Sequence, residues 1–200
     1  AGYLAKKLGL PINKLIVATN QNDILHRAIS KGKYEAEHVS ETISPSMDIQ
    51  IASNFERLIY DLNNHDSSQT LDDMKNIKQN GKYTIDVEKL KKINQDFLSA
   101  RISEQETLDV IKNIYEKFNM VLDPHTAIGY GAFDKHDLKG NNIVLATAHP
   151  CKFPDAILKA INLKSDLPDE LKFILDEKEN YGIIENNLKE IKQYILGKIK

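Results

Sequence analysis

Residues 145–154, with the sequence LATAHPCKFP, carry the side chains best suited to binding a small ligand. A short apolar run ends there in a hydroxyl, an imidazole and an ammonium group, contributed by Thr147, His149 and Lys152. Ligands of open α/β sheets bind just beyond the carboxyl ends of the strands. We therefore expect a strand over residues 143–146 and a ligand near Thr147, although a threonine bonded to backbone is the alternative.

A second apolar run, residues 14–19, leads into the polar sequence NQND. A continuous apolar run of this length is typical of a parallel strand that is buried on both faces. Its end brings Thr19 and Asn20 toward the same crevice. The alternative for Asn20 is a helix N-cap, which Asn22 or Asp23 could supply equally well.

A third group of polar side chains, Ser44, Ser46, Asp48, Asn54 and Arg57, could bind the phosphate of a monoester. Ser46 offers a hydroxyl, Asn54 an amide, and Arg57 a cation with bidentate phosphate geometry. Asn54 and Arg57 are three residues apart on a helix expected over residues 49–62, so they share a face. The alternative for Arg57 is a solvated surface charge.

His125 and Lys152 complete the candidate ligand-binding residues. His125 follows a proline at an expected helix start, where backbone N–H groups without partners favour anions. It could also be a capping or packing histidine. Lys152 could help bind a phosphate, and Cys151 is expected to be a small apolar residue. The histidines show no spacing typical of a metal site, so we expect no metal.

Composition limits the classes of function. The chain has 200 residues, of which 41% are hydrophobic and 28% charged, and a formal net charge of -2. These values are typical of a globular chain and give no electrostatic signature of nucleic-acid or membrane partners. A single cysteine fits a reducing compartment, so we expect a cytoplasmic protein.

Helices and strands are expected to alternate along the chain. Ser103 and Glu106 form a capping box at the start of one helix. The alternation of helices with apolar strands predicts an α/β fold. The expected helices cover residues 1–10, 24–30, 49–62 and 103–118, a segment from 124, and the region from 153 onward, including 186–199.

Six sequence motifs carry a family resemblance. They are GYLAKKLGLP (2–11), ATNQNDIL (18–25), SPSMDIQ (44–50), SNFERL (53–58), DPHTA (123–127) and ATAHP (146–150). With these motifs in this order, the chain resembles the carboxy-terminal part of the threonine synthase family, pyridoxal-phosphate enzymes related to the tryptophan synthase β-subunit.

The resemblance implies the fold and the organisation of the chain. It implies a three-layer αβα arrangement with a mostly parallel sheet, part of a fold-type II pyridoxal-phosphate enzyme. Residues 1–163 would belong to the large cofactor-binding domain, with a family-specific insertion near 63–102, and residues 164–200 would form a C-terminal helical tail. The family's glycine-rich phosphate loop and Schiff-base lysine match nothing here, so we expect a missing N-terminal part.

The resemblance also implies an activity. The intact enzyme would convert O-phospho-L-homoserine and water to L-threonine and phosphate, with pyridoxal 5'-phosphate as cofactor. Thr147 would bind the pyridine nitrogen of the cofactor, and Asn20 and Thr19 would lie beside its ring. The substrate would contact residues from several segments, namely Ser46, Asn54, Arg57, His125 and Lys152.

Two alternatives stay open. A threonine dehydratase or a cysteine synthase would share the fold, although the motifs over residues 44–50 and 54–57 favour threonine synthase. The chain by itself could also be an inactive fragment, because no catalytic residue is expected within it.

Overall fold

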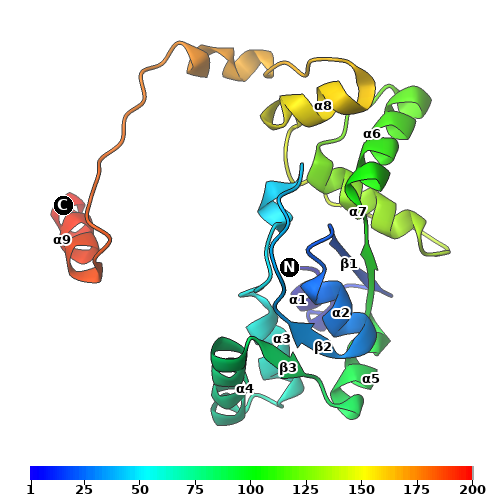
Figure 1. Ribbon diagram of the computed structural model, residues 1–200, viewed down its shortest axis with the longest axis vertical. Coiled ribbons are helices and arrows are strands. Elements are labelled where there is room, and N and C mark those ends of the chain that lie inside the picture. Colours follow the sequence, from blue (N-terminus) through cyan, green and yellow to red (C-terminus); the bar gives the residue numbers. More distant parts are fainter. Residues whose placement is uncertain (200) are drawn as a thin grey trace. The chain divides into compact units, whose positions relative to one another are not determined.

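The computed structural model describes residues 1–199, which form two compact units, residues 1–165 and the residues from 166 onward (Figure 1). The helices are α1 (Gly2–Lys7), α2 (Ile24–Lys31), α3 (Phe55–Leu62), α4 (Ser67–Asn80), α5 (Val87–Asp96), α6 (Glu104–Phe118), α7 (Pro124–Asp134), α8 (Pro154–Ile161) and α9 (Leu188–Lys198). The strands are β1 (Leu15–Thr19), β2 (Lys33–Glu35), β3 (Lys82–Thr84) and β4 (Phe97–Arg101). Short 3-10 helices cover Pro45–Met47, Pro150–Lys152 and Asp169–Leu175.

Strands β1 and β4 pair in parallel, with Leu15 opposite Phe97 and Thr19 opposite Arg101. The connection between them contains β2 and β3, which form a small antiparallel pair, and the helices α2 to α5. Parallel neighbours require such a crossover, because the chain must return to the starting edge before it can run in the same direction.

Helices cover both faces of the parallel pair. Ile16 and Ala18 of β1 pack with Ile128 and Ala132 of α7, whereas Val17 packs against the apolar cluster that includes α2. Alternate residues of a strand point to opposite faces. Helices α2 and α7 therefore lie on opposite faces of the sheet, which confirms the predicted αβα arrangement.

The structure corrects the prediction of the strands in two places. Residues 143–146 form no strand, and Ile143 and Leu145 are 87% and 69% exposed. A strand requires a neighbour to accept and donate its backbone hydrogen bonds, and this segment pairs with no strand among residues 1–199. Conversely, the strand Phe97–Arg101 was absent from the prediction, which placed these residues in an insertion.

The helix expected over residues 49–62 begins only at Phe55. The backbone N–H of Ala52 donates to the Tyr34 hydroxyl at 2.7 Å, and the Tyr34 ring stacks on Phe55 with centroids 4.8 Å apart. These contacts with β2 hold residues 49–54 outside helical geometry. Asn54 therefore precedes the helix as its N-cap residue, and its side chain makes no capping hydrogen bond.

The predicted capping box at the start of α6 is confirmed. The hydroxyl of Ser103 accepts from the backbone of Glu106, and the Glu106 carboxylate accepts from the Ser103 backbone at 2.7 Å. Helix α6 packs against both α7 and α8. Its firm start therefore supports α7, the helix that carries His125.

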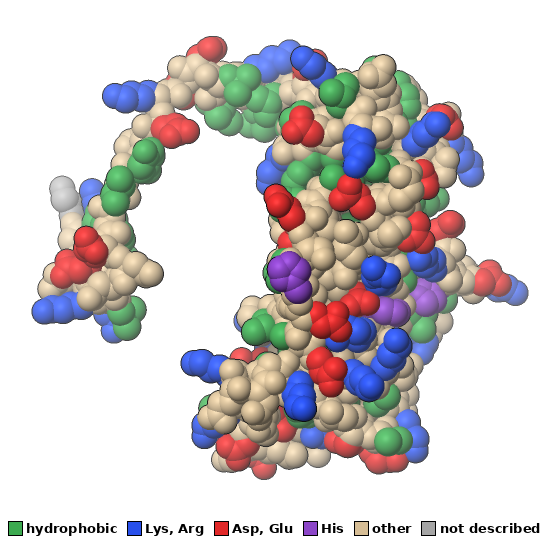
Figure 2. Space-filling model, in the orientation of Figure 1, with side chains coloured by type: hydrophobic (Ala, Val, Ile, Leu, Met, Phe, Trp, Pro, Cys, Tyr) green, Lys and Arg blue, Asp and Glu red, His purple; other side chains and the backbone are tan. Residues whose placement is uncertain are grey.

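Charges of both signs are interspersed over the face drawn in Figure 2. Of the described chain, residues 1–199, no helix combines the length and the apolar character needed to cross a bilayer. The boundaries predicted for the domains and for the insertion stay a prediction.

Candidate functional site

Asn20 connects the carboxyl end of β1 to residues 42–48. Its side chain is almost completely buried, and the amide nitrogen lies 2.9 Å from the hydroxyls of Thr42 and Ser44 and 2.7 Å from Oδ1 of Asp48. The side-chain oxygen of Asn20 accepts from the backbone N–H of Asn22 at 2.8 Å. The amide therefore holds two chain segments together, and both of its ends are engaged.

Asp48 is the second centre of this cluster. One carboxylate oxygen accepts from the backbone N–H of Thr42 at 2.8 Å, and the other accepts from the Thr42 hydroxyl at 2.7 Å. Met47 beside it packs against the apolar layer between β1 and α7. Residues 42–48 are thus fixed on one side by polar contacts and on the other by apolar packing.

Asp123 organises the start of α7. Its Oδ1 accepts from the backbone N–H groups of His125 and Thr126 at 2.9 and 3.3 Å, as expected of an N-cap residue. The same oxygen lies 3.1 Å from Nδ1 of His125, and Oδ2 accepts from the Thr126 hydroxyl. The Asp123 side chain is 1% exposed and the His125 side chain 8%.

Two loops that carry predicted ligand contacts attach to the start of α7. The backbone N–H of Ser46 donates to Nε2 of His125 at 3.3 Å. The backbone N–H of Thr147 donates to the Thr126 hydroxyl at 3.2 Å. Ser46 and Thr147, which are far apart in sequence, are therefore held by adjacent residues of one helix.

The side chains of Ser46 and Thr147 are available to a ligand. Both residues are exposed, and within residues 1–199 neither side-chain hydroxyl makes a hydrogen bond. In contrast, Thr19 is buried and its hydroxyl lies 3.4 Å from the carbonyl oxygen of Ala100. The structure thus brings together Thr19, Asn20, Ser46, His125 and Thr147, with free hydroxyls only at Ser46 and Thr147.

Lys152 lies close to this group through Phe153. The Phe153 ring packs on His125 with centroids 4.8 Å apart, and the Lys152 ammonium lies 6.0 Å from the Phe153 centroid. In the part of the chain described, no carboxylate pairs with Lys152. Its exposed charge is therefore available to an anion.

Asn54 and Arg57 are not joined to this group by any hydrogen bond or ion pair between described residues. Both are exposed at the start of α3, where the Arg57 backbone N–H donates to the Asn54 carbonyl oxygen at 3.3 Å. Their predicted substrate contacts, like the other predicted ligand contacts, stay predictions.

Asp123 and Thr126 were not among the predicted site residues, whereas Asp48 belonged to the predicted phosphate-binding group. Asp123 stands directly before a proline at a helix start, a pattern typical of an N-cap residue. That pattern identifies the cap. It does not reveal that the same carboxylate also contacts two side chains.

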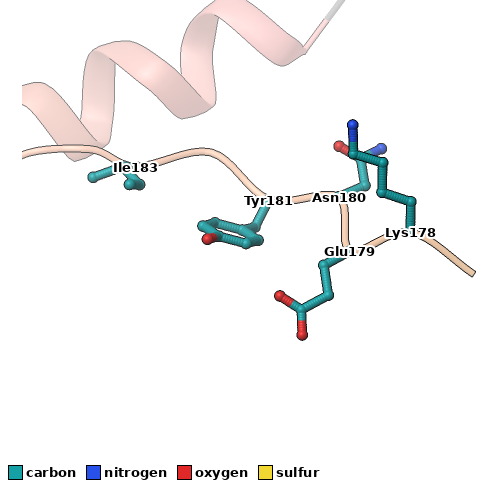
Figure 3. A pocket seen from close by; sticks show the side chains of 5 residues that line it. All are labelled: Lys178, Glu179, Asn180, Tyr181 and Ile183. Atoms are coloured by element: carbon teal, nitrogen blue, oxygen red, sulfur yellow. The ribbon is translucent and has the colours of Figure 1, made fainter. Parts of the chain in front are cut away.

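Two further hollows lie away from this group of residues. Figure 3 shows the pocket lined by Lys178, Glu179, Asn180, Tyr181 and Ile183, all of them exposed and close together in sequence. A further pocket of about 510 Å³ lies between α1, α3 and α5. Nowhere in residues 1–199 do three His, Cys, Asp or Glu side chains gather as metal ligands.

Comparison with known proteins identifies relatives over nearly the whole chain. Residues 126–195 match the family described as "Threonine synthase, C-terminal". Threonine synthase from Pseudomonas aeruginosa is 37% identical over 98% of this chain and 42% of its own length. The enzyme from Saccharomyces cerevisiae is 42% identical over 92% of this chain and 41% of its own length.

Solved structures agree with these matches. The pyridoxal-phosphate-bound threonine synthase from Brucella melitensis superimposes with a TM-score of 0.86 at 42% identity, over 97% of this chain and 42% of that one. Yeast threonine synthase gives a TM-score of 0.81 at 39% identity, over 98% and 44%. The chain therefore spans somewhat under half the length of the relatives it matches.

Proposed function

This chain belongs to the threonine synthase family, and we propose that it forms the carboxy-terminal part of an enzyme that converts O-phospho-L-homoserine and water to L-threonine and phosphate. The observation that carries the proposal is the attachment of Ser46 and Thr147 to the start of α7. Because of this attachment the backbones of both residues are fixed while their side-chain hydroxyls stay free. The two residues come from the motifs expected to contact the substrate and the cofactor.

The residues present fit pyridoxal 5'-phosphate. Thr147 combines an anchored backbone N–H with an exposed hydroxyl that has no partner among residues 1–199, as a contact for the pyridine nitrogen requires. When bound, this cofactor supplies an electron sink for electrons left at a substrate carbon. A neutral hydroxyl keeps the ring nitrogen protonated less firmly than a carboxylate would. With Thr147 as its partner, the cofactor ring would therefore be a weaker electron sink than with an aspartate.

Asn20 and Thr19 contribute the wall beside the ring in this proposal. The Asn20 amide is fully engaged with residues 42–48, so its main effect is to fix that segment against the end of β1. The Thr19 hydroxyl is turned toward the Ala100 carbonyl. Both residues would thus form one wall of the cofactor site and keep bulk water away from that side of the ring.

The substrate phosphate requires hydroxyl donors and cations. Ser46 offers a free hydroxyl, and Lys152 an exposed ammonium. Charge-assisted hydrogen bonds of this kind are about twice as strong as neutral ones. Arg57 and Asn54 would bind at the substrate's periphery. His125 would act through Ser46, because both of its ring nitrogens are already engaged.

The chemistry also needs groups that this chain does not match. We propose that an N-terminal part supplies the lysine that holds the cofactor covalently and the loop that binds the cofactor phosphate. Residues 1–200 by themselves would then be inactive. A cytoplasmic location belongs to the same proposal.

Phosphate release by the complete enzyme, meaning this chain together with its N-terminal part, tests the function. The enzyme should release inorganic phosphate and L-threonine in equal amounts from O-phospho-L-homoserine, and residues 1–200 alone should release none. The absence of phosphate release, with formation of 2-oxobutanoate from L-threonine, would instead identify a dehydratase and refute the proposal.

A further inference from the structure

We propose that Asp123 is a positioning residue that holds the backbones of Ser46 and Thr147 through two separate contacts, His125 and Thr126. The proposal rests on the proposed function, because that function assigns Ser46 to the substrate and Thr147 to the cofactor. One buried carboxylate would then set the relative placement of the two ligands.

The first contact fixes the tautomer of His125. The Ser46 N–H donates to Nε2 at 3.3 Å, so Nε2 must carry no hydrogen. The ring proton therefore resides on Nδ1, which lies 3.1 Å from Oδ1 of Asp123. A carboxylate can only accept a hydrogen bond. Asp123 therefore selects the His125 tautomer whose Nε2 can accept the hydrogen bond from the Ser46 N–H.

Packing holds the plane of the same ring. Phe153 contacts His125 with centroids 4.8 Å apart, and the His125 side chain is only 8% exposed. With its plane fixed by Phe153 and its proton fixed by Asp123, the imidazole presents Nε2 to Ser46 in one orientation.

The second contact fixes the hydroxyl of Thr126. A hydroxyl has a single proton, and Thr126 gives it to Oδ2 of Asp123. The hydroxyl oxygen can then only accept from the Thr147 N–H, which lies 3.2 Å away. Thr126 is 5% exposed, so water does not compete freely for this bond.

Helix capping alone does not account for this arrangement. A cap requires one oxygen that accepts from backbone N–H groups, and Oδ1 of Asp123 does so for His125 and Thr126. The other oxygen, Oδ2, accepts only from a side chain. An asparagine at position 123 would keep one acceptor, so it could cap α7 but could not serve the helix and Thr126 together.

Single-amide hydrogen exchange on the complete enzyme, without substrate or added cofactor, tests the two contacts. Thr126→Val should accelerate exchange at the Thr147 amide about fivefold, the effect of one lost hydrogen bond, while Thr126→Ser should not. Asp123→Asn, which keeps one of the two side-chain oxygens and can still accept from His125, should accelerate the Thr147 amide, whereas Asp123→Ala, which removes both oxygens, should accelerate the Ser46 and the Thr147 amides. Thr70→Val, at a helical threonine that is also 5% exposed, should change neither.

Steady-state kinetics and cofactor titration on the same variants test the consequence for ligands. Thr126→Val should raise the cofactor dissociation constant about fivefold, with Thr126→Ser close to wild type. Asp123→Asn should raise that constant, and Asp123→Ala should raise both that constant and the KM for O-phospho-L-homoserine, with a smaller change in kcat.

The outcomes separate the two proposals. If the wild-type enzyme releases no phosphate, the proposed function fails, while the exchange rates still decide whether Asp123 holds the two backbones. If Asp123→Ala accelerates only the first amides of α7, Asp123 is a cap and the positioning role is overturned. The role is also overturned if both loops loosen but ligand binding stays unchanged in an active enzyme.

Discussion

Replacing Glu106 by glutamine should weaken the start of α6 in a pH-dependent manner. One carboxylate oxygen of Glu106 lies 2.7 Å from the Lys135 ammonium, and the other accepts from the Ser103 N–H and hydroxyl at 2.7 Å. Lys135, and then the two donors of Ser103, lower the pKa of Glu106 from 4.5 to about 2. Glutamine retains an acceptor for the capping box but removes the charge.

The sign follows from the lowered pKa. Because the folded state favours the ionised carboxylate, its stabilisation is complete above pH 4.5 and is lost as the pH falls toward 2. A shift of that size would correspond to about 3 kcal/mol without screening. The Glu106 side chain is 45% exposed, so we expect about 1 kcal/mol.

Native-state hydrogen exchange at the Glu106 and Thr107 amides of the complete enzyme measures this effect. At pH 7, Glu106→Gln should lower the free energy of local opening by about 1 kcal/mol, and at pH 3 the difference should fall below half of that. Glu116→Gln, at an exposed position near the other end of α6, is the control and should change little. A difference that stays constant from pH 7 to pH 3 would refute the reasoning.

Three further outcomes are expected for the complete enzyme. Thr147→Val should weaken cofactor binding about fivefold and Thr147→Ser should not, as measured by absorbance titration; equal affinities would exclude a hydroxyl contact. Lys152→Ala should raise the KM for O-phospho-L-homoserine roughly tenfold, with Lys178→Ala as the control, because a charge-assisted contact is lost. Ile128→Ala should lower the free energy of unfolding, measured with urea, by about 2–5 kcal/mol, because Ile128 is 1% exposed. Val87→Ala, at a side chain that is 67% exposed, should lower it far less.

Local signals predicted the elements that depend on neighbouring residues. The capping box at Ser103 and the proline after Asp123 mark the starts of α6 and α7 correctly. The apolar run that forms β1 was also predicted, because a parallel strand that packs against helices on both faces is apolar along its length. In each case the signal lies within a few neighbouring residues of the sequence.

Elements that depend on distant partners were predicted less well. Strand β4 has a short and mixed sequence, and its identity comes from its pairing with β1, whose residues lie about eighty positions earlier. The start of α3 is set by Tyr34, which bonds Ala52 and stacks on Phe55. Helical periodicity alone predicts a helix from residue 49, because the pattern contains no information about the Tyr34 hydroxyl, which comes from strand β2.

The sequence by itself determined the family, the alternation of helices and strands, and the side chains that could meet a ligand, since motifs and residue types are local properties. The tertiary structure decided which of those side chains are free. Asn20 and His125 are engaged at both ends, whereas the hydroxyls of Ser46 and Thr147 are not. Only folding decides this, because a hydrogen bond between residues 79 positions apart, such as Ser46 and His125, exists only once the chain has brought them together.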